Sequence, residues 1–178
     1  MEMIAPPRPD AGETRDNKTF EALMWAMSRP GAVREMPEPG LLPVALALVD
    51  IETQVCCDEP GLAEAIARTG ARKAGMDEAG YLFVTGDPLP AIRAAEPGSA
   101  LYPDDGATIV VAASLSGGPR LRLTGPGIET SIEASPDLPP AFWAERARRS
   151  AYPAGHDLII VDERRIVALP RSTQVEVL

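Results

Sequence analysis

The residues of this sequence that can do chemistry centre on a single histidine, His156, which is followed directly by Asp157. Such a pair can orient an imidazole as a general base or supply two metal ligands. A metal site needs three or four ligands, and the sequence has no second histidine and no spaced cysteine cluster. We therefore favour the alternative that Asp157 anchors the loop entering the next strand. A triad with Ser114 or Ser116 lacks the Gly-x-Ser-x-Gly elbow, so a hydrolase is not favoured.

Two glycine-rich segments, SGGP at 116–119 and TGPG at 124–127, raise the question of a phosphate cradle. Neither has the GxxxxGK pattern of a P-loop or the GxGxxG pattern of a dinucleotide-binding turn. Both lie between strand-like runs, so hairpin turns explain them, and anion binding by backbone N–H groups can be added to that role. Four arginines can clamp an anion by bidentate contacts: Arg122, Arg164, Arg165 and Arg171. Spacing alone favours the alternative, an exposed strand face with ion pairs to Asp162, Glu163 or Glu176.

Composition narrows the class of protein further. The 178 residues carry a formal net charge of −9, which argues against binding to nucleic acid or to an anionic membrane surface. Residues 1–119 carry 9 basic and 18 acidic groups, whereas residues 120–178 carry eight of each, so an anion site is expected in the second part. The adjacent Cys56 and Cys57 are expected to be reduced thiols, and no apolar stretch is long enough for a membrane span. These features predict a cytoplasmic protein.

The helices that must position these residues are predicted from apolar spacing and from prolines and glycines. Asp16 or Asn17 is expected to cap the first helix, whose apolar stripe recurs at Phe20, Leu23, Met24 and Met27. It ends at the turn 28–31, where Pro30 stops the helix and Gly31 permits a left-handed conformation. Further helices are expected at 41–49, 62–68, 90–95 and 139–149. The last has a basic end formed by Arg146, Arg148 and Arg149.

The strands are predicted from β-branched and alternating runs. They are expected at 53–57, 81–85, 107–113, 120–124, 128–132, 157–161, 165–169 and 173–177. The apolar run 107–113 is typical of a central strand covered on both faces, and 165–169 is expected to form a hairpin with 157–161. The sequence therefore predicts an α/β fold with a single-domain mixed β-sheet flanked by helices over residues 16–178. Residues 1–15 are predicted to form an extended or flexible N-terminal arm.

Three segments, taken together and in order, resemble the PhnH family of phosphonate metabolism. They are FEALMWAMSRPG at 20–31, ATIVVAASLSGGPRLRLTGPGI at 107–128 and YPAGHDLIIVDERRIVALPRSTQVEV at 152–177. The resemblance covers the chain from about residue 20 to its end, and residues 30–105 match only in general pattern. His156 falls at a variable position of the family's Pro-x-Gly-x-Asp motif, which further weakens its case as a base.

The resemblance implies a fold similar to that of the pyridoxal-phosphate-dependent transferases, without a cofactor site. A Schiff base needs a lysine, and the chain has only Lys18 and Lys73, neither in a sequence context that would desolvate it. No cofactor and no metal are therefore expected.

The resemblance also implies a homodimer that joins PhnG, PhnI and PhnJ in the carbon–phosphorus lyase core complex. There the chain would be an accessory subunit that supports formation of ribose 1-methylphosphonate 5-triphosphate from ATP and methylphosphonate, with the chemistry on PhnI. No catalytic set emerges from residue spacing, and we expect no turnover by the chain alone. Two alternatives stay open: a stand-alone phosphonate- or nucleotide-binding protein or enzyme, and a relic of a pyridoxal-phosphate enzyme with another task.

The candidate residues for ligand or partner binding are motif positions. They are Ser28, Arg29, Pro30, Gly31, Ser116, Gly117, Gly118, Arg122, Thr124, Gly125, Gly127, Gly155, Asp157, Arg171 and Thr173. Those assigned to the stand-alone alternative are Arg122, Thr124, Arg171 and Thr173, with the backbone N–H groups of 116–118.

Overall fold

A computed structural model describes residues 8–178, so residues 1–7 of the predicted arm lie outside the described residues. The helices are α1 (Ala11–Ser28), α2 (Leu41–Leu48), α3 (Pro60–Ala67), α4 (Leu89–Ala94) and α5 (Pro140–Arg149), with a 3-10 turn at Pro103–Asp105. The strands are β1 (Arg34–Glu35), β2 (Gln54–Cys57), β3 (Arg72–Lys73), β4 (Tyr81–Val84), β5 (Thr108–Ala112), β6 (Leu121–Thr124), β7 (Ile132–Ala134), β8 (Asp157–Asp162), β9 (Arg165–Leu169) and β10 (Gln174–Val177). Within residues 8–178 no helix could cross a membrane.

The larger sheet has seven strands in the order β1-β9-β8-β5-β4-β2-β3. Strands β3, β2, β4, β5 and β8 run parallel, and β9 and β1 add an antiparallel edge. The predicted hairpin of β8 with β9 is confirmed, as is the central position of the strand at 107–113. The mixed, helix-flanked sheet of the predicted fold class is therefore confirmed.

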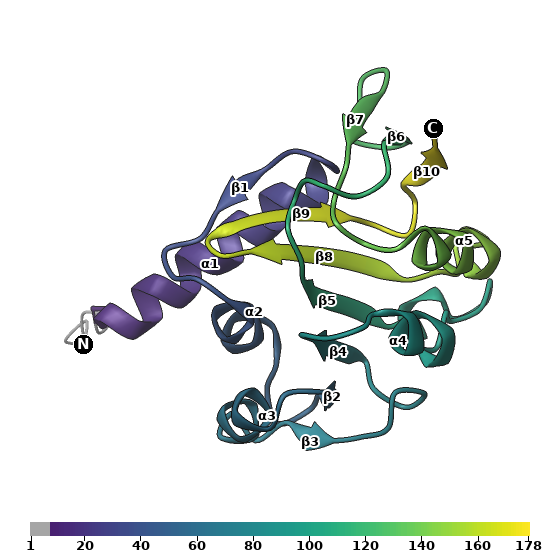
Figure 1. The fold of residues 1–178 in the computed structure, drawn as a ribbon. Coiled ribbons are helices and arrows are strands. Elements are labelled where there is room, and N and C mark those ends of the chain that lie inside the picture. The colour runs from purple at the N-terminus through teal and green to yellow at the C-terminus, as the bar shows by residue number, and fades with distance from the viewer. Residues whose placement is uncertain (1–7) are drawn as a thin grey trace, which may run out of the picture.

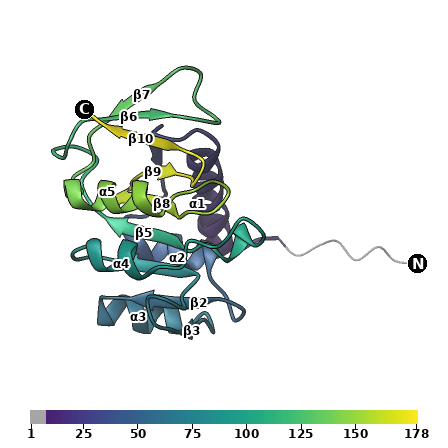
Figure 2. The ribbon, with the colours of Figure 1, turned by 90° about the vertical axis from the view of Figure 1, so that its right-hand side faces the viewer.

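Helices cover both faces of this sheet, with α4 and α5 on one side and α1, α2 and α3 on the other (Figures 1 and 2). Successive side chains of a strand point to opposite faces, and the strands divide their residues between two cores accordingly. In β5, Ile109 and Val111 pack toward α4 and α5, whereas Val110 packs toward α1 and α2. The central strands are apolar on both faces because both faces are buried.

A second, three-stranded antiparallel sheet in the order β10-β6-β7 lies beyond the β9 side of the larger sheet (Figures 1 and 2). The prediction of one sheet is therefore wrong in this respect. The prediction of a strand at 128–132 is wrong as well, because residues 125–131 form the loop between β6 and β7, and β7 begins only at Ile132. The segment 116–119 is not a hairpin turn, since it connects β5 of the large sheet to β6 of the small one.

Helix α1 differs from its prediction at its start and in its buried face. It begins at Ala11, because Asp10 and Glu13 form a capping box, so residues 11–15 are helical and not part of an extended arm. The buried face carries Thr19, Ala22, Leu23 and Ala26. Two residues of the predicted apolar stripe, Phe20 and Met24, are 45% and 57% exposed. The stripe is therefore not the buried face of the helix, which consists mainly of small residues that let the helix approach the sheet closely.

Candidate functional site

Asp157 and Arg171 form a largely buried ion pair at the end of the large sheet where β5 and β8 begin. The Asp157 carboxylate accepts from the backbone N–H of Arg171 at 2.8 Å and from Nη2 of its guanidinium at 2.6 Å. Arg171 Nε also lies 3.2 Å and 3.3 Å from the two carboxylate oxygens. Bidentate arginine–carboxylate contacts of this kind have a fixed orientation. Asp157 therefore anchors the chain at this strand, as the sequence predicted.

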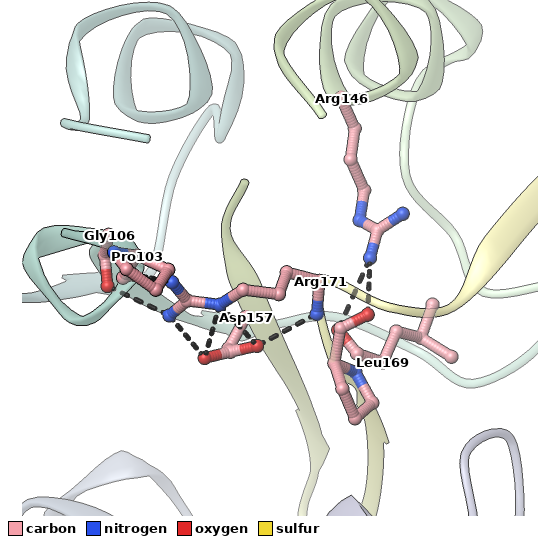
Figure 3. Close-up of polar contacts among 7 residues, drawn as sticks. Pro103, Gly106, Arg146, Asp157, Leu169 and Arg171 are labelled. Atoms are coloured by element: carbon pink, nitrogen blue, oxygen red, sulfur yellow. Dashed lines mark hydrogen bonds and ion pairs between the residues drawn. The ribbon is translucent and has the colours of Figure 1, made fainter. Parts of the chain in front are cut away.

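The same guanidinium reaches a third segment of the chain. Arg171 donates to the carbonyls of Pro103 and Gly106, the latter at 3.0 Å (Figure 3). Gly106 and Gly155 leave the space for this side chain, because a Cβ on Gly106 would lie 2.5 Å from the guanidinium and one on Gly155 would lie 3.2 Å from the Arg171 Cβ. Arg171 thus ties the end of β9 to the segments that precede β5 and β8.

Arg146 on α5 is a second arginine at this site and is 3% exposed. It donates to the carbonyls of Leu169 at 3.3 Å and Pro170 at 2.9 Å (Figure 3) and to that of Thr173 at 3.1 Å. Burial lowers the pKa of Arg146 to about 10, and the charge of Asp157 opposes that shift. The guanidinium therefore stays protonated at neutral pH, and no carboxylate is within hydrogen-bonding reach of it among residues 8–178.

His156 is fully buried next to these arginines, and within residues 8–178 its ring makes no hydrogen bond to Asp157. Its Nε2 donates to the carbonyl of Ala95 at 3.0 Å, which Arg149 also reaches at 2.6 Å. Burial lowers the pKa of His156, and the charges of Arg149, Arg146 and Arg171 lower it further against the bond to Ala95. The imidazole is therefore neutral at pH 7 and surrounded by positive charge.

A cavity of about 450 Å³ opens between α5 and the chain that leads into β10. A cavity of this size falls in the range of small-molecule sites. Its lining includes both buried arginines and the loop between β6 and β7: Pro126, Trp143, Arg146, Ala147, Ser150, Tyr152, Arg171, Ser172, Thr173, Gln174 and Val175. Four of these residues carry a buried polar atom that has no hydrogen-bond partner within residues 8–178, namely Trp143 Nε1, Arg146 Nε, Ser150 Oγ and Thr173 Oγ1.

Of the candidate residues, Gly155, Asp157, Arg171 and Thr173 come together at this site. The glycines of 124–127 connect it to the turn that ends α1. Gly125 lies against the backbone at 172–173, and a Cβ on Gly127 would lie 2.4 Å from the carbonyl oxygen of Ser28. The motif at 28–31 therefore has a packing role. Gly31 donates to the Ala168 carbonyl at 3.2 Å, Pro30 is buried, and the Arg29 guanidinium lies 4.7 Å from the centre of the Trp25 ring.

The remaining candidates lie elsewhere. Arg122 is 45% exposed in its side chain and pairs with Glu176 at 3.0 Å, and Thr124 faces Gln174 across the small sheet. The segment 116–118 follows the opposite end of β5. Gly118 donates to the Ser135 carbonyl at 3.0 Å, and Ser116 donates its N–H to Ser114 Oγ at 3.2 Å, so two N–H groups of the predicted nest already have partners.

Sequence reasoning missed Arg146 as a site residue, because it was assigned simply to the basic end of the helix at 139–149. The signal was present in the spacing, because Arg146 follows the buried Phe142 by one helical turn and so lies on the apolar face. Arg148 does fit the earlier interpretation, since it is exposed and pairs with Glu145 at 2.9 Å. An arginine on the apolar face of a helix is a mark of a buried polar site.

The two cysteines carry free thiols, and burial raises the pKa of both. Lys18 and Lys73, the two lysines weighed for a Schiff base, are both exposed. Among residues 8–178 no group of three His, Cys, Asp or Glu side chains is arranged to hold a metal ion.

The fold and the site thus define an α/β protein with a buried arginine–carboxylate cluster at one end of its sheet. The chain belongs to the family of bacterial phosphonate metabolism protein (PhnH), whose model matches residues 11–176, and the predicted family is confirmed. It is 36% identical over 171 residues to the putative C-P lyase subunit protein HtxG of Stutzerimonas stutzeri, covering 90% of this chain and 86% of the relative. It is 32% identical over 179 residues to the alpha-D-ribose 1-methylphosphonate 5-triphosphate synthase subunit PhnH of Rhizobium meliloti (strain 1021), covering 88% of each.

Proposed function

We propose that this chain is an accessory subunit of a carbon–phosphorus lyase complex in organic phosphonate catabolism. In that complex it supports formation of ribose 1-methylphosphonate 5-triphosphate from ATP and methylphosphonate. The observation that carries the proposal is the PhnH family match over residues 11–176, together with two relatives whose names are those of subunits of such systems. Relatives that share nearly their whole length also share a fold, and with it the surfaces that a subunit presents.

An exposed apolar stripe on α1 supports a role in assembly. Phe20 and Met24 lie one helical turn apart and are 45% and 57% exposed, and the half-buried Met27 extends the stripe. Apolar side chains that gather on an exposed surface mark sites of protein contact. We assign this stripe to contacts with the other subunits of the complex.

The finer parts of the proposal come from the family resemblance. They are a homodimer, association with PhnG, PhnI and PhnJ, a cytoplasmic location, and a fold akin to that of the pyridoxal-phosphate-dependent transferases. Sedimentation of the purified chain measures the first of these directly.

Co-purification tests the proposal. The chain, expressed with PhnG, PhnI and PhnJ subunits of a phosphonate-degrading bacterium and a tag on PhnI, should elute with them as one species in size-exclusion chromatography. Phe20→Ser combined with Met24→Ser should weaken that association, whereas Arg148→Gln, an exposed change on α5, should leave it intact. A wild-type chain that elutes separately from the tagged subunit would refute the proposal.

A further inference from the structure

The buried charges beside the cavity do not balance. Arg146 and Arg171 both line it. Arg149 belongs to the same group of charges, because all three arginines act electrostatically on His156. Among residues 8–178 the ion pairs of these three arginines are limited to the one between Arg171 and Asp157. Arginine is favoured where a carboxylate or phosphate is to be bound, because its guanidinium presents a planar set of donors. Among the described residues Arg146 hydrogen-bonds only to carbonyl oxygens, and the carboxylate whose charge acts on it, that of Asp157, is already paired with Arg171.

Donors are also left over in the same place. The guanidinium has five N–H groups, and Arg146 uses three of them on the carbonyls of Leu169, Pro170 and Thr173. Three other lining groups also lack partners in the part of the chain that the structure describes: Trp143 Nε1, Ser150 Oγ and Thr173 Oγ1. Buried polar groups are nearly always satisfied, so a concentration of donors without a protein partner around one cavity favours a site that takes a polar ligand.

These two observations point to the same chemistry. We propose that the cavity between α5 and residues 171–175 binds a small oxyanion of the phosphate or phosphonate type. Arg146 supplies a guanidinium that no carboxylate contacts within residues 8–178, Ser150 and Thr173 supply hydroxyl donors, and Trp143 supplies an indole N–H. Charge-assisted contacts from arginine to phosphate oxygens are strong, and the cavity volume leaves room for a substituent on phosphorus.

The cavity contains its own reporter, because Trp143 is 3% exposed and lines it. The only other tryptophan, Trp25, is 46% exposed on α1 and is removed by Trp25→Phe. In that background, titration with inorganic phosphate, methylphosphonate or ATP should change the Trp143 fluorescence to saturation. The same ligands should raise the melting temperature, since a ligand that binds only the folded state stabilises it. Sodium chloride at matched ionic strength is the reference.

Two conservative variants test the assignment without depending on Arg146, whose loss can unfold the chain. Ser150→Ala and Thr173→Val remove hydroxyls that bond to nothing in the described chain, so both should fold as the wild type does. Each should raise the dissociation constant about tenfold, the loss expected for one hydrogen bond to a charged group. Arg148→Gln, on the exposed face of the same helix, should leave it unchanged.

The inference is overturned if none of the three ligands changes the fluorescence beyond the chloride reference at millimolar concentration, or if Ser150→Ala and Thr173→Val both bind as the wild type does. A response to ATP that phosphate and methylphosphonate do not share would also overturn it, because the cavity would then not bind a small oxyanion by itself. All measurements use the isolated chain. Their outcome is therefore independent of whether the chain joins a carbon–phosphorus lyase complex.

Discussion

The Asp157–Arg171 ion pair should carry a large share of the stability of this fold, and a matched pair of substitutions measures that share. Asp157→Asn removes the charge that faces the guanidinium, and the side chains of Asp157 and Arg171 are only 17% and 16% exposed. Glu176→Gln makes the same chemical change in the pair with Arg122, whose partners are 64% and 45% exposed. The two substitutions therefore differ mainly in burial.

The expected costs follow from that difference. Breaking a buried pair and leaving one charge behind lowers the free energy of unfolding by about 3–5 kcal/mol. Arg171 would keep its hydrogen bonds to two carbonyls, so we expect Asp157→Asn to lie at the low end of this range, about 3 kcal/mol. The exposed pair is worth less than about 1 kcal/mol. For a chain of this length, about 3 kcal/mol lowers the melting temperature by about 6–12 °C. Glu176→Gln should lower it by less than about 4 °C.

Thermal and urea unfolding of both variants at pH 7 provide the assay. Arg171→Met added to Asp157→Asn should cost less than the sum of the two single changes, because it removes the stranded charge. Equal losses for Asp157→Asn and Glu176→Gln, or strictly additive losses in the double variant, would refute the assignment of Arg171 and Asp157 as a coupled structural pair.

Three further predictions concern other parts of the chain. Burial and three arginines lower the pKa of His156 in the folded state below its ordinary 6.5, so the unfolded state binds the proton first as the pH falls. The free energy of unfolding should therefore decrease below pH 6.5, by up to about 1.4 kcal/mol per pH unit. His156→Gln should flatten this pH dependence in urea titrations. Gly127→Ala should lower the free energy of unfolding by about 2–4 kcal/mol, because the residue has a positive φ and its new Cβ would clash with the backbone. Gly117→Ala should lower it by about 1–2 kcal/mol, because φ is also positive there but the space around the Cβ is open. Burial raises the thiol pKa of Cys56 and Cys57. In the folded protein at pH 7 both thiols should therefore react with a disulfide reagent at least about tenfold more slowly than they do in the urea-unfolded chain. Equal rates in the two states would contradict their burial.

Local chemistry made much of this fold predictable. The runs around Val110 and Ile159 are continuously apolar rather than alternating, as expected for strands covered on both faces, and both lie at the centre of the sheet. The turn at Pro30 and Gly31 ends α1 as expected. Asp157 anchors its strand, as the favoured interpretation held. Each of these features depends on residues close together in sequence.

What could not be predicted depends on distant contacts. The small sheet forms because β6 pairs with β10 about fifty residues later, for example Val175 with Leu123, and no local pattern encodes that pairing. The stripe of Phe20 and Met24 has helical spacing, yet spacing does not say which side of a helix meets the sheet. Arg146 was missed because its charge outweighed its position on the apolar face of α5.

The most direct test of the proposed subunit role is a reconstitution of the synthase reaction. PhnG, PhnI and PhnJ subunits of a phosphonate-degrading bacterium are prepared without that bacterium's own PhnH. They are supplied with ATP and methylphosphonate, with and without this chain. Ribose 1-methylphosphonate 5-triphosphate is then measured by phosphorus NMR. The account predicts that product forms when the chain is added and not when the chain is supplied alone. Product formation that is the same with and without the chain, or turnover by the chain alone, would contradict it.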